Sequence, residues 1–121
     1  MYIIEIEDFF SAAHQLRGYH GKCENLHGHN WRVRVSVRGT ELLPTGMLMD
    51  FGDLKKTVKE VLATLDHVFL NEKEPFVTEN PTTERIARYI YESVAARLPG
   101  NVRMDAVTAW ESEKSRATYR E

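Results

Sequence analysis

The sequence predicts an α+β domain built on an antiparallel sheet. Apolar and polar residues alternate near both ends of the chain, and two stretches of helical periodicity follow one another between these regions. Strands that follow one another without intervening helices favour antiparallel pairing over a parallel sheet. We therefore expect the order β, β, β, α, α, β, β, in a single domain that spans residues 1–121.

The N-terminal region predicts two strands. Residues 2–10 alternate between apolar and acidic side chains, as a half-buried strand does, whereas residues 11–26 are expected to form a loop. Alternation returns over residues 27–39, where a tryptophan and three valines share one face. Because side chains repeat every two residues along a strand, His27 and His29 should point toward this apolar face.

A turn and a short strand are expected before the first helix. Glycine and proline punctuate residues 39–46, and residues 47–51 then predict a short strand. The helix is expected from about Asp53 to Leu65, because leucines and valines recur there at helical spacing.

The second helix and two final strands complete the predicted fold. Asn80 is a good N-cap and Pro81 suits the first helical position, while Pro and Gly at 99–100 end the helix. Residues 102–111 and 116–120 predict two strands joined by a polar turn. Two helices on one face leave the edges and the other face of the sheet in need of a partner, which predicts a homo-oligomer.

The composition narrows the class of protein. A hydrophobic fraction of 42% in 121 residues is sufficient for a core, and a net charge of -2 argues against nucleic-acid binding by bulk electrostatics. No apolar run approaches the roughly 18 residues of a membrane span. The first residues lack a signal sequence, so we expect a cytoplasmic protein. Its single cysteine cannot form an internal disulfide.

Four candidate metal donors lie within sixteen residues. They are His14, Cys23, His27 and His29, and imidazole and thiolate are donors that zinc prefers. Three histidine ligands leave a fourth position for water or substrate, which is the pattern of catalytic zinc. The alternative is that the histidines are a polar rim of the sheet. We predict that His14, His27 and His29 bind Zn²⁺.

The role of Cys23 stays open on spacing alone. It can be a fourth zinc ligand that closes a structural site, or a small buried residue, which is the usual fate of a lone cysteine. It can also be a catalytic base, because a nearby dication favours the thiolate.

Two further features carry carboxylates. Asp66 and His67 suit an acid/base relay in which the carboxylate orients the imidazole, although a histidine at a helix end also interacts with the helix dipole. Glu111 ends an apolar run. It can accept two hydrogen bonds from a guanidine-like ligand edge, or it can be a solvated strand end.

Six motifs occur together in a fixed order. The motifs are F-S-A-A-H at 10–14, C-E-N-L-H-G-H at 23–29, G-M-L-M-D-F-G-D-L-K at 46–55, L-D-H at 65–67, N-P-T-T-E at 80–84 and W-E at 110–111. This ordered set resembles the pyruvoyltetrahydropterin synthase superfamily over essentially the whole chain, and it is most similar to the 6-carboxy-5,6,7,8-tetrahydropterin synthases of queuosine biosynthesis. The three residues between Cys23 and His27 are typical of the bacterial carboxytetrahydropterin synthases, whereas animal pyruvoyl enzymes have a wider gap.

The resemblance implies a fold, an assembly and a site. The fold is the tunnelling fold (T-fold), in which trimers close their sheets into a barrel and stack into hexamers, with active sites between subunits. The zinc ligands would be the three histidines already named. The remaining roles fall to Cys23 as catalytic base, Asp66 and His67 as its relay partners, Glu111 as the pterin anchor, and Thr82 and Thr83 as lining of the pterin pocket.

The resemblance also implies a reaction. The substrate would be 7,8-dihydroneopterin triphosphate, converted by a zinc-dependent lyase to 6-carboxy-5,6,7,8-tetrahydropterin with release of acetaldehyde and triphosphate. The alternative within the family is a 6-pyruvoyltetrahydropterin synthase or a related dihydropterin-processing enzyme. From a different class, a non-catalytic zinc-stabilised module would give Asp66, His67 and Glu111 no role.

Overall fold

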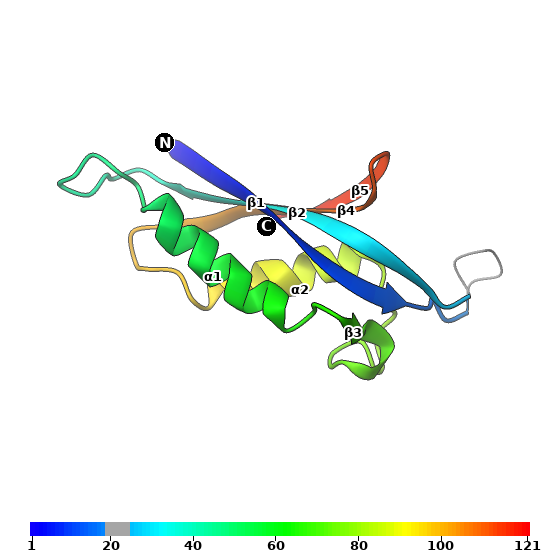
Figure 1. Cartoon of the computed structure of the whole chain (residues 1–121). Helices are drawn as coiled ribbons and strands as arrows, with labels where there is room; N and C mark the ends of the chain where they lie inside the picture. The colour runs from blue at the N-terminus through cyan, green and yellow to red at the C-terminus, as the bar shows by residue number, and fades with distance from the viewer. Residues whose placement is uncertain (19–24) are drawn as a thin grey trace.

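The computed structural model describes residues 1–18 and 25–121 and consists of a five-stranded sheet with two helices across one face (Figure 1). The strand order is β3-β1-β2-β4-β5, and every pairing is antiparallel except that of β3 with β1. The expected α+β class is therefore confirmed. The elements are β1 (Tyr2–His14), β2 (His27–Gly39), α1 (Phe51–Ala63), β3 (Val68–Phe69), the 3-10 turn η2 (Leu70–Glu72), α2 (Thr83–Ala95), β4 (Arg103–Ser112) and β5 (Ser115–Tyr119).

The first two strands pair along their entire length. The register runs from Tyr2 opposite Gly39 to His14 opposite His27. The prediction that residues 11–26 form a loop is therefore wrong for residues 11–14, which continue β1 because the start of β2 offers them backbone partners. This extension places His14 on a strand, directly beside the first histidine of β2.

The first helix begins earlier than expected. Its N-cap is Asp50, whose carboxylate accepts a hydrogen bond from Gly52 N–H at 2.6 Å. The predicted short strand over residues 47–51 is wrong, because this segment forms a turn and then the cap and first turn of α1. The apolar stripe is buried as expected, with Leu54 and Val58 fully inaccessible to solvent.

The second helix begins later than expected. Its N-cap is Thr82, which accepts a hydrogen bond from Arg85 N–H at 3.2 Å, so the prediction of an Asn80 cap followed by Pro81 in the helix is wrong. The amide of Asn80 is instead engaged with the backbone of Arg17. A side chain already bonded elsewhere cannot also cap the helix.

The last two strands form the predicted hairpin, whereas β3 was not predicted. Two residues are too short to produce an alternating pattern, yet β3 adds a parallel partner to the free edge of β1 at Ala12 and Ala13. In β4 the pairing with β5 shifts between Trp110 and Ser112, so Glu111 has no partner residue in β5.

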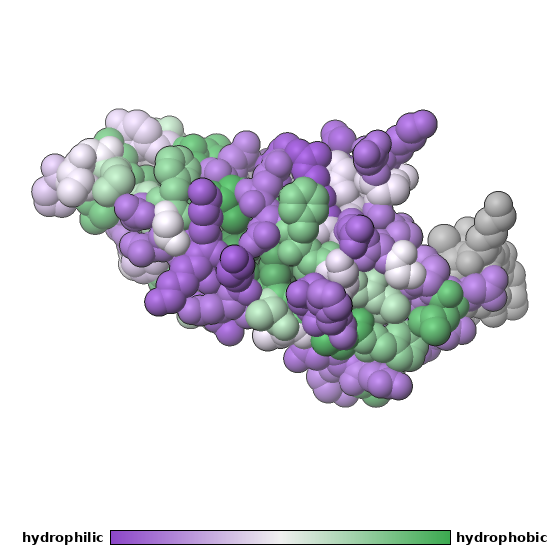
Figure 2. All heavy atoms as spheres, in the orientation of Figure 1, coloured by the Kyte–Doolittle hydropathy of each residue, from purple (hydrophilic) through white to green (hydrophobic). Residues whose placement is uncertain are grey.

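The core lies between the sheet and the two helices. Its centre is the inward face of β2, where Trp31, Val33, Val35 and Val37 are all fully buried. On the opposite face, the side chain of Phe9 is 63% exposed. Figure 2 shows apolar side chains in small groups among hydrophilic ones on the face in view. No helix in the described ranges is long and apolar enough to cross a membrane.

Candidate metal centre

Three histidine side chains meet at one end of the sheet. His14 lies opposite His27 in the register of β1 and β2, and His29 lies two residues further along β2 on the same face. The ring centroids of His14 and His27 are 4.5 Å apart, and those of His27 and His29 are 4.7 Å apart. The structure thus brings together the three predicted ligands through strand pairing alone.

Glu111 is the fourth member of this cluster. Its Oε1 lies 2.9 Å from His29 Nε2, 3.4 Å from His14 Nε2 and 3.6 Å from His27 Nε2. One ligand atom from each of the four residues lies within 4.8 Å of the others, as in a site that can hold a metal ion. Sequence reasoning found Glu111 but missed its contact with the histidines. The signal in the sequence is the alternation of β4. Ala109 is buried, so Glu111, two residues later, lies on the same inward face.

The tautomers of two histidines follow from their backbone partners. His14 Nδ1 lies 2.8 Å from Pro81 O, and His27 Nδ1 lies 2.6 Å from Asn25 O. A carbonyl oxygen only accepts hydrogen bonds, so both Nδ1 atoms carry the proton and both Nε2 atoms of the neutral rings present lone pairs. These two Nε2 atoms are 2.9 Å apart. Lone pairs at this distance repel one another unless a cation or a proton lies between them.

The third histidine indicates which cation fits. His29 Nε2 is buried and, despite its proximity to Glu111, makes no hydrogen bond of acceptable geometry. One shared proton can join His14 to His27, but it leaves His29 unsatisfied. A divalent metal ion can accept all three nitrogens together, and three imidazoles with a carboxylate are a suitable donor set.

Burial favours the metal-binding form of two of the three rings. Desolvation lowers the pKa of His14 and, in the same way, that of His29, although Glu111 opposes the shift at both rings. Neutral imidazole is the form that binds a metal. The fully buried ring of Trp31 lies edge-on to His14 at 5.1 Å and to His29 at 5.2 Å, and so forms an apolar floor beneath them.

Asp66 and His67 form a separate pair at the edge of β1. Asp66 Oδ1 accepts a hydrogen bond from Ser11 N–H at 2.8 Å, and Asp66 Oδ2 lies 3.0 Å from His67 Nδ1. The bond from Ser11, followed by that from His67, lowers the pKa of Asp66. His67 is 82% exposed and has a φ of 57°, in the left-handed region that few non-glycine residues adopt, histidine being among the more frequent.

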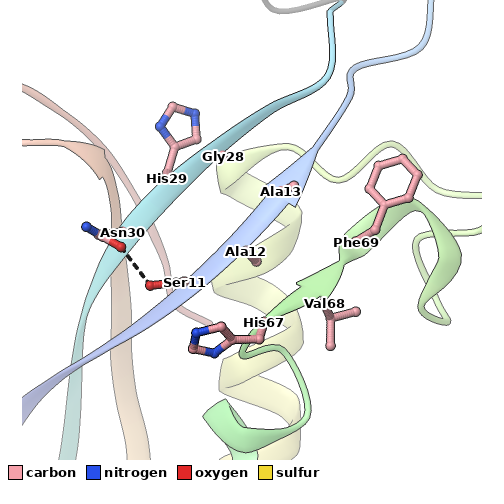
Figure 3. Close-up of a pocket in the computed structure, with 9 residues that line it drawn as sticks. All are labelled: Ser11, Ala12, Ala13, Gly28, His29, Asn30, His67, Val68 and Phe69. Carbon is pink, nitrogen blue, oxygen red and sulfur yellow. Dashed lines mark hydrogen bonds between the residues drawn. The ribbon is translucent and has the colours of Figure 1, made fainter.

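This pair does not reach the three histidines of its own chain. In Figure 3, β1 passes between His67 and His29, although both residues line one open pocket of about 500 Å³ together with Ser11, Asn30 and Phe69. Within the described ranges, Asp66 N–H donates to Leu62 O at 2.9 Å and His67 N–H donates to Ser11 O at 2.6 Å, while the side chains of the pair contact Ser11 and each other. The predicted relay partners are therefore together, but apart from the candidate metal centre.

The remaining predicted site residues are distributed as follows. Thr82 caps α2, and both Thr82 and Thr83 are half-buried. They directly follow Pro81, whose carbonyl contacts His14, so they lie next to the cluster in the chain. Cys23 lies outside the described residues.

The fold and the site define a sheet-based protein with a candidate catalytic metal centre at the end of its central strands. The sequence profile of 6-pyruvoyl tetrahydropterin synthase matches residues 3–121. The chain therefore belongs to the 6-pyruvoyl tetrahydropterin synthase family, and it is a pterin-processing enzyme. A non-catalytic zinc module does not fit this membership.

Individual relatives carry different activity names. The chain is 40% identical to the 6-carboxy-5,6,7,8-tetrahydropterin synthase of Synechocystis sp., over 98% of this chain and 93% of the relative. It is 39% identical to the dihydroneopterin monophosphate aldolase of Pyrococcus furiosus, over 87% and 85%. Among solved structures, the Caenorhabditis elegans 6-pyruvoyl tetrahydropterin synthase matches with a TM-score of 0.85 and 37% identity, over 100% and 97%. The expected T-fold is thereby confirmed for the single chain.

Proposed function

We propose that the protein is a zinc-dependent lyase that converts 7,8-dihydroneopterin triphosphate to 6-carboxy-5,6,7,8-tetrahydropterin, with release of acetaldehyde and triphosphate, in queuosine biosynthesis. One observation carries the proposal: three imidazoles converge in a family member, two of them with their tautomer set by backbone carbonyls. The similarity to the Synechocystis carboxytetrahydropterin synthase supports the choice of product.

In this proposal His14, His27 and His29 hold the zinc ion. When bound, zinc supplies a Lewis acid and a template for the side-chain hydroxyls of the substrate, which acidifies the neighbouring carbon-bound protons. The Nδ1–H bonds of His14 and His27 to backbone carbonyls fix the ring orientation and increase the basicity of the liganding nitrogens.

Proton transfer falls to Cys23 and the Asp66–His67 pair. Cys23 thiolate would remove or return a proton on the substrate side chain. Asp66 holds the proton on His67 Nδ1, which leaves the exposed Nε2 available to accept or deliver another. Because β1 separates His67 from the histidine cluster of its own chain, we propose that the pair serves the active site of a neighbouring subunit in a trimer or a dimer of trimers.

Glu111, Thr82 and Thr83 would bind the pterin. Glu111 would accept hydrogen bonds from its 2-amino group and N3, and the carboxylate is 26% exposed, so a ligand can reach it. The two threonines would line the pocket at the start of α2.

The alternative is a 6-pyruvoyltetrahydropterin synthase or a related dihydropterin-processing enzyme. The similarity to the Caenorhabditis elegans structure favours it, as does that to the Pyrococcus furiosus aldolase. The three-residue gap between Cys23 and His27 favours the carboxy product instead.

The decisive experiment measures both products at once. Zinc-loaded protein is incubated with 7,8-dihydroneopterin triphosphate, and acetaldehyde and the pterin product are quantified together, with His27→Ala as the metal-site control. We expect acetaldehyde in equal amount to 6-carboxytetrahydropterin. Triphosphate release with a 6-pyruvoyl product and no acetaldehyde would establish the alternative, and no turnover of either kind would refute both activities.

A further inference from the structure

The edge of β1 that faces away from β2 is hydrogen-bonded by β3, and similar bonds continue along the residues that follow β1. In the sheet, β3 pairs only with Ala12 and Ala13 of that edge. Nevertheless, the chain segment after β3 continues alongside the end of β1 (Figure 1), and it supplies hydrogen bonds at residues 15 and 17. The partners at these two positions are side chains rather than backbone groups.

Two asparagines supply these bonds in the same way. Asn71 Oδ1 accepts from Gln15 N–H at 2.8 Å, and Asn71 Nδ2 donates to Gln15 O at 2.7 Å. Asn80 Oδ1 accepts from Arg17 N–H at 2.7 Å, and Asn80 Nδ2 donates to Arg17 O at 2.9 Å. A primary amide carries the donor and acceptor of a peptide group, so each asparagine takes the place of one strand residue.

The same segment holds the His14 ring. His14 Nδ1 donates to Pro81 O at 2.8 Å, and Pro81 directly follows Asn80. The Asn80–Pro81 dipeptide therefore contacts the chain at two points, the backbone of Arg17 and the ring of His14. His14 is 1% exposed and is the only deeply buried histidine among the described residues.

The side chain of Arg17 binds the backbone of the segment that connects the two asparagines. Its guanidinium donates to Asn71 O at 3.3 Å, Phe76 O at 2.9 Å and Glu79 O at 3.3 Å. The loop that carries Asn80 is thereby attached to the chain that follows His14. A shift of Asn80 would move the Pro81 carbonyl relative to the ring that it orients.

Helix capping does not account for Asn80. The cap of α2 is Thr82, and the Asn80 amide has both of its polar atoms on Arg17. We propose that Asn80 is a positioning residue of the candidate metal centre, which holds the Pro81 carbonyl against His14 and so fixes the tautomer and orientation of this ring. This inference rests on the metal site of the proposed function.

Metal affinity and ligand geometry test this role. The probes are Zn²⁺, by competition with a chromophoric chelator, and Co²⁺, by its visible spectrum, on the full chain with no substrate. Outer partners of liganding histidines typically contribute tenfold to a hundredfold to metal affinity. We expect Asn80→Ala to bind Zn²⁺ about tenfold more weakly and to alter the Co²⁺ spectrum.

Two further variants sharpen the test. Asn80→Asp keeps the acceptor for Arg17 N–H but loses the donor to Arg17 O, so it should weaken binding less, and it decides the question if Asn80→Ala does not fold. Asn101→Ala is the matched control, because Asn101 Nδ2 donates to Leu48 O at 2.9 Å near Gly39, at the opposite end of β2 from the histidines. It should leave both metal readouts unchanged.

The outcomes separate this inference from the metal site itself. Wild-type affinity and spectrum in Asn80→Asp, and in Asn80→Ala where that variant folds, would overturn the positioning role while the metal site stands. Undiminished Zn²⁺ affinity in His27→Ala would instead remove the metal site, and the positioning role with it.

Discussion

Replacing Glu111 by glutamine separates the two roles that its position allows. As a pterin anchor, the carboxylate accepts two charge-assisted hydrogen bonds, each with a net contribution of about 1.5–3 kcal/mol. Because the Glu111 side chain is 26% exposed, we take the lower end of that range. Glutamine keeps one neutral acceptor oxygen but sets an amide N–H against the second pterin donor. The expected loss is therefore about 2–3 kcal/mol, or roughly thirtyfold to a hundredfold weaker binding of the pterin.

The assay measures pterin and metal on the same protein. Titration calorimetry with 7,8-dihydroneopterin, which lacks the triphosphate, gives the pterin affinity, and chelator competition gives the zinc affinity. Glu113→Gln is the matched control, because it removes the same charge from an exposed position two residues away. We expect Glu111→Gln to lose pterin affinity and to keep zinc.

Two results would refute this reasoning. A change in pterin affinity below about threefold would remove the anchor role, because it corresponds to less than 1 kcal/mol. A large loss of zinc would show that Glu111 is a metal ligand, as its 2.9 Å distance from His29 Nε2 also allows.

Three other substitutions test the remaining roles. His27→Ala should lose both stoichiometric zinc and turnover, because it removes one of three imidazole ligands; an active, metal-free variant would refute the zinc assignment. Cys23→Ala should keep zinc and lose turnover, whereas loss of zinc on elemental analysis would identify a fourth ligand. Asp66→Asn keeps the acceptor for Ser11 N–H but removes the charge beside His67; kcat should fall about a hundredfold with zinc content unchanged, and an unaltered kcat would exclude the relay.

Period-two alternation predicted the part of the site that lies on one strand. It placed His27 and His29 on the face of Trp31, and the structure has them there. The same logic could not extend β1 to His14, because residues 11–14 alternate weakly and are strand only through their pairing with β2. Register between strands is a tertiary property, so the grouping of His14 with His27 was predicted from the clustering of metal donors in the chain and not from alternation.

Side-chain bonding to the backbone accounts for what sequence reasoning missed. Asn80 before Pro81 has the pattern of a helix start, and only the tertiary contact with Arg17 shows its use. Similarly, the alternation of β4 predicts on which face of the sheet Glu111 lies, but it does not predict which side chains Glu111 contacts. Its contact with the histidines depends on the pairing of β4 with β2, which brings Ala109 opposite Val33.

Substitution of Trp31 tests whether the apolar ring beneath His14 and His29 contributes to metal binding as well as to folding. Trp31→Phe should lower the free energy of unfolding by about 2 kcal/mol, through lost burial and a partly filled cavity. Val37→Ala, equally buried but about 20 Å along β2 by strand rise, should cost a similar amount. Both are measured by denaturant unfolding of the metal-free protein. Only Trp31→Phe removes contacts beneath His14 and His29, so only it should weaken zinc binding, by about tenfold. Equal zinc affinity in the two variants would mean that the contacts of Trp31 do not help to orient His14 and His29, and Trp31 would then have no role beyond the core.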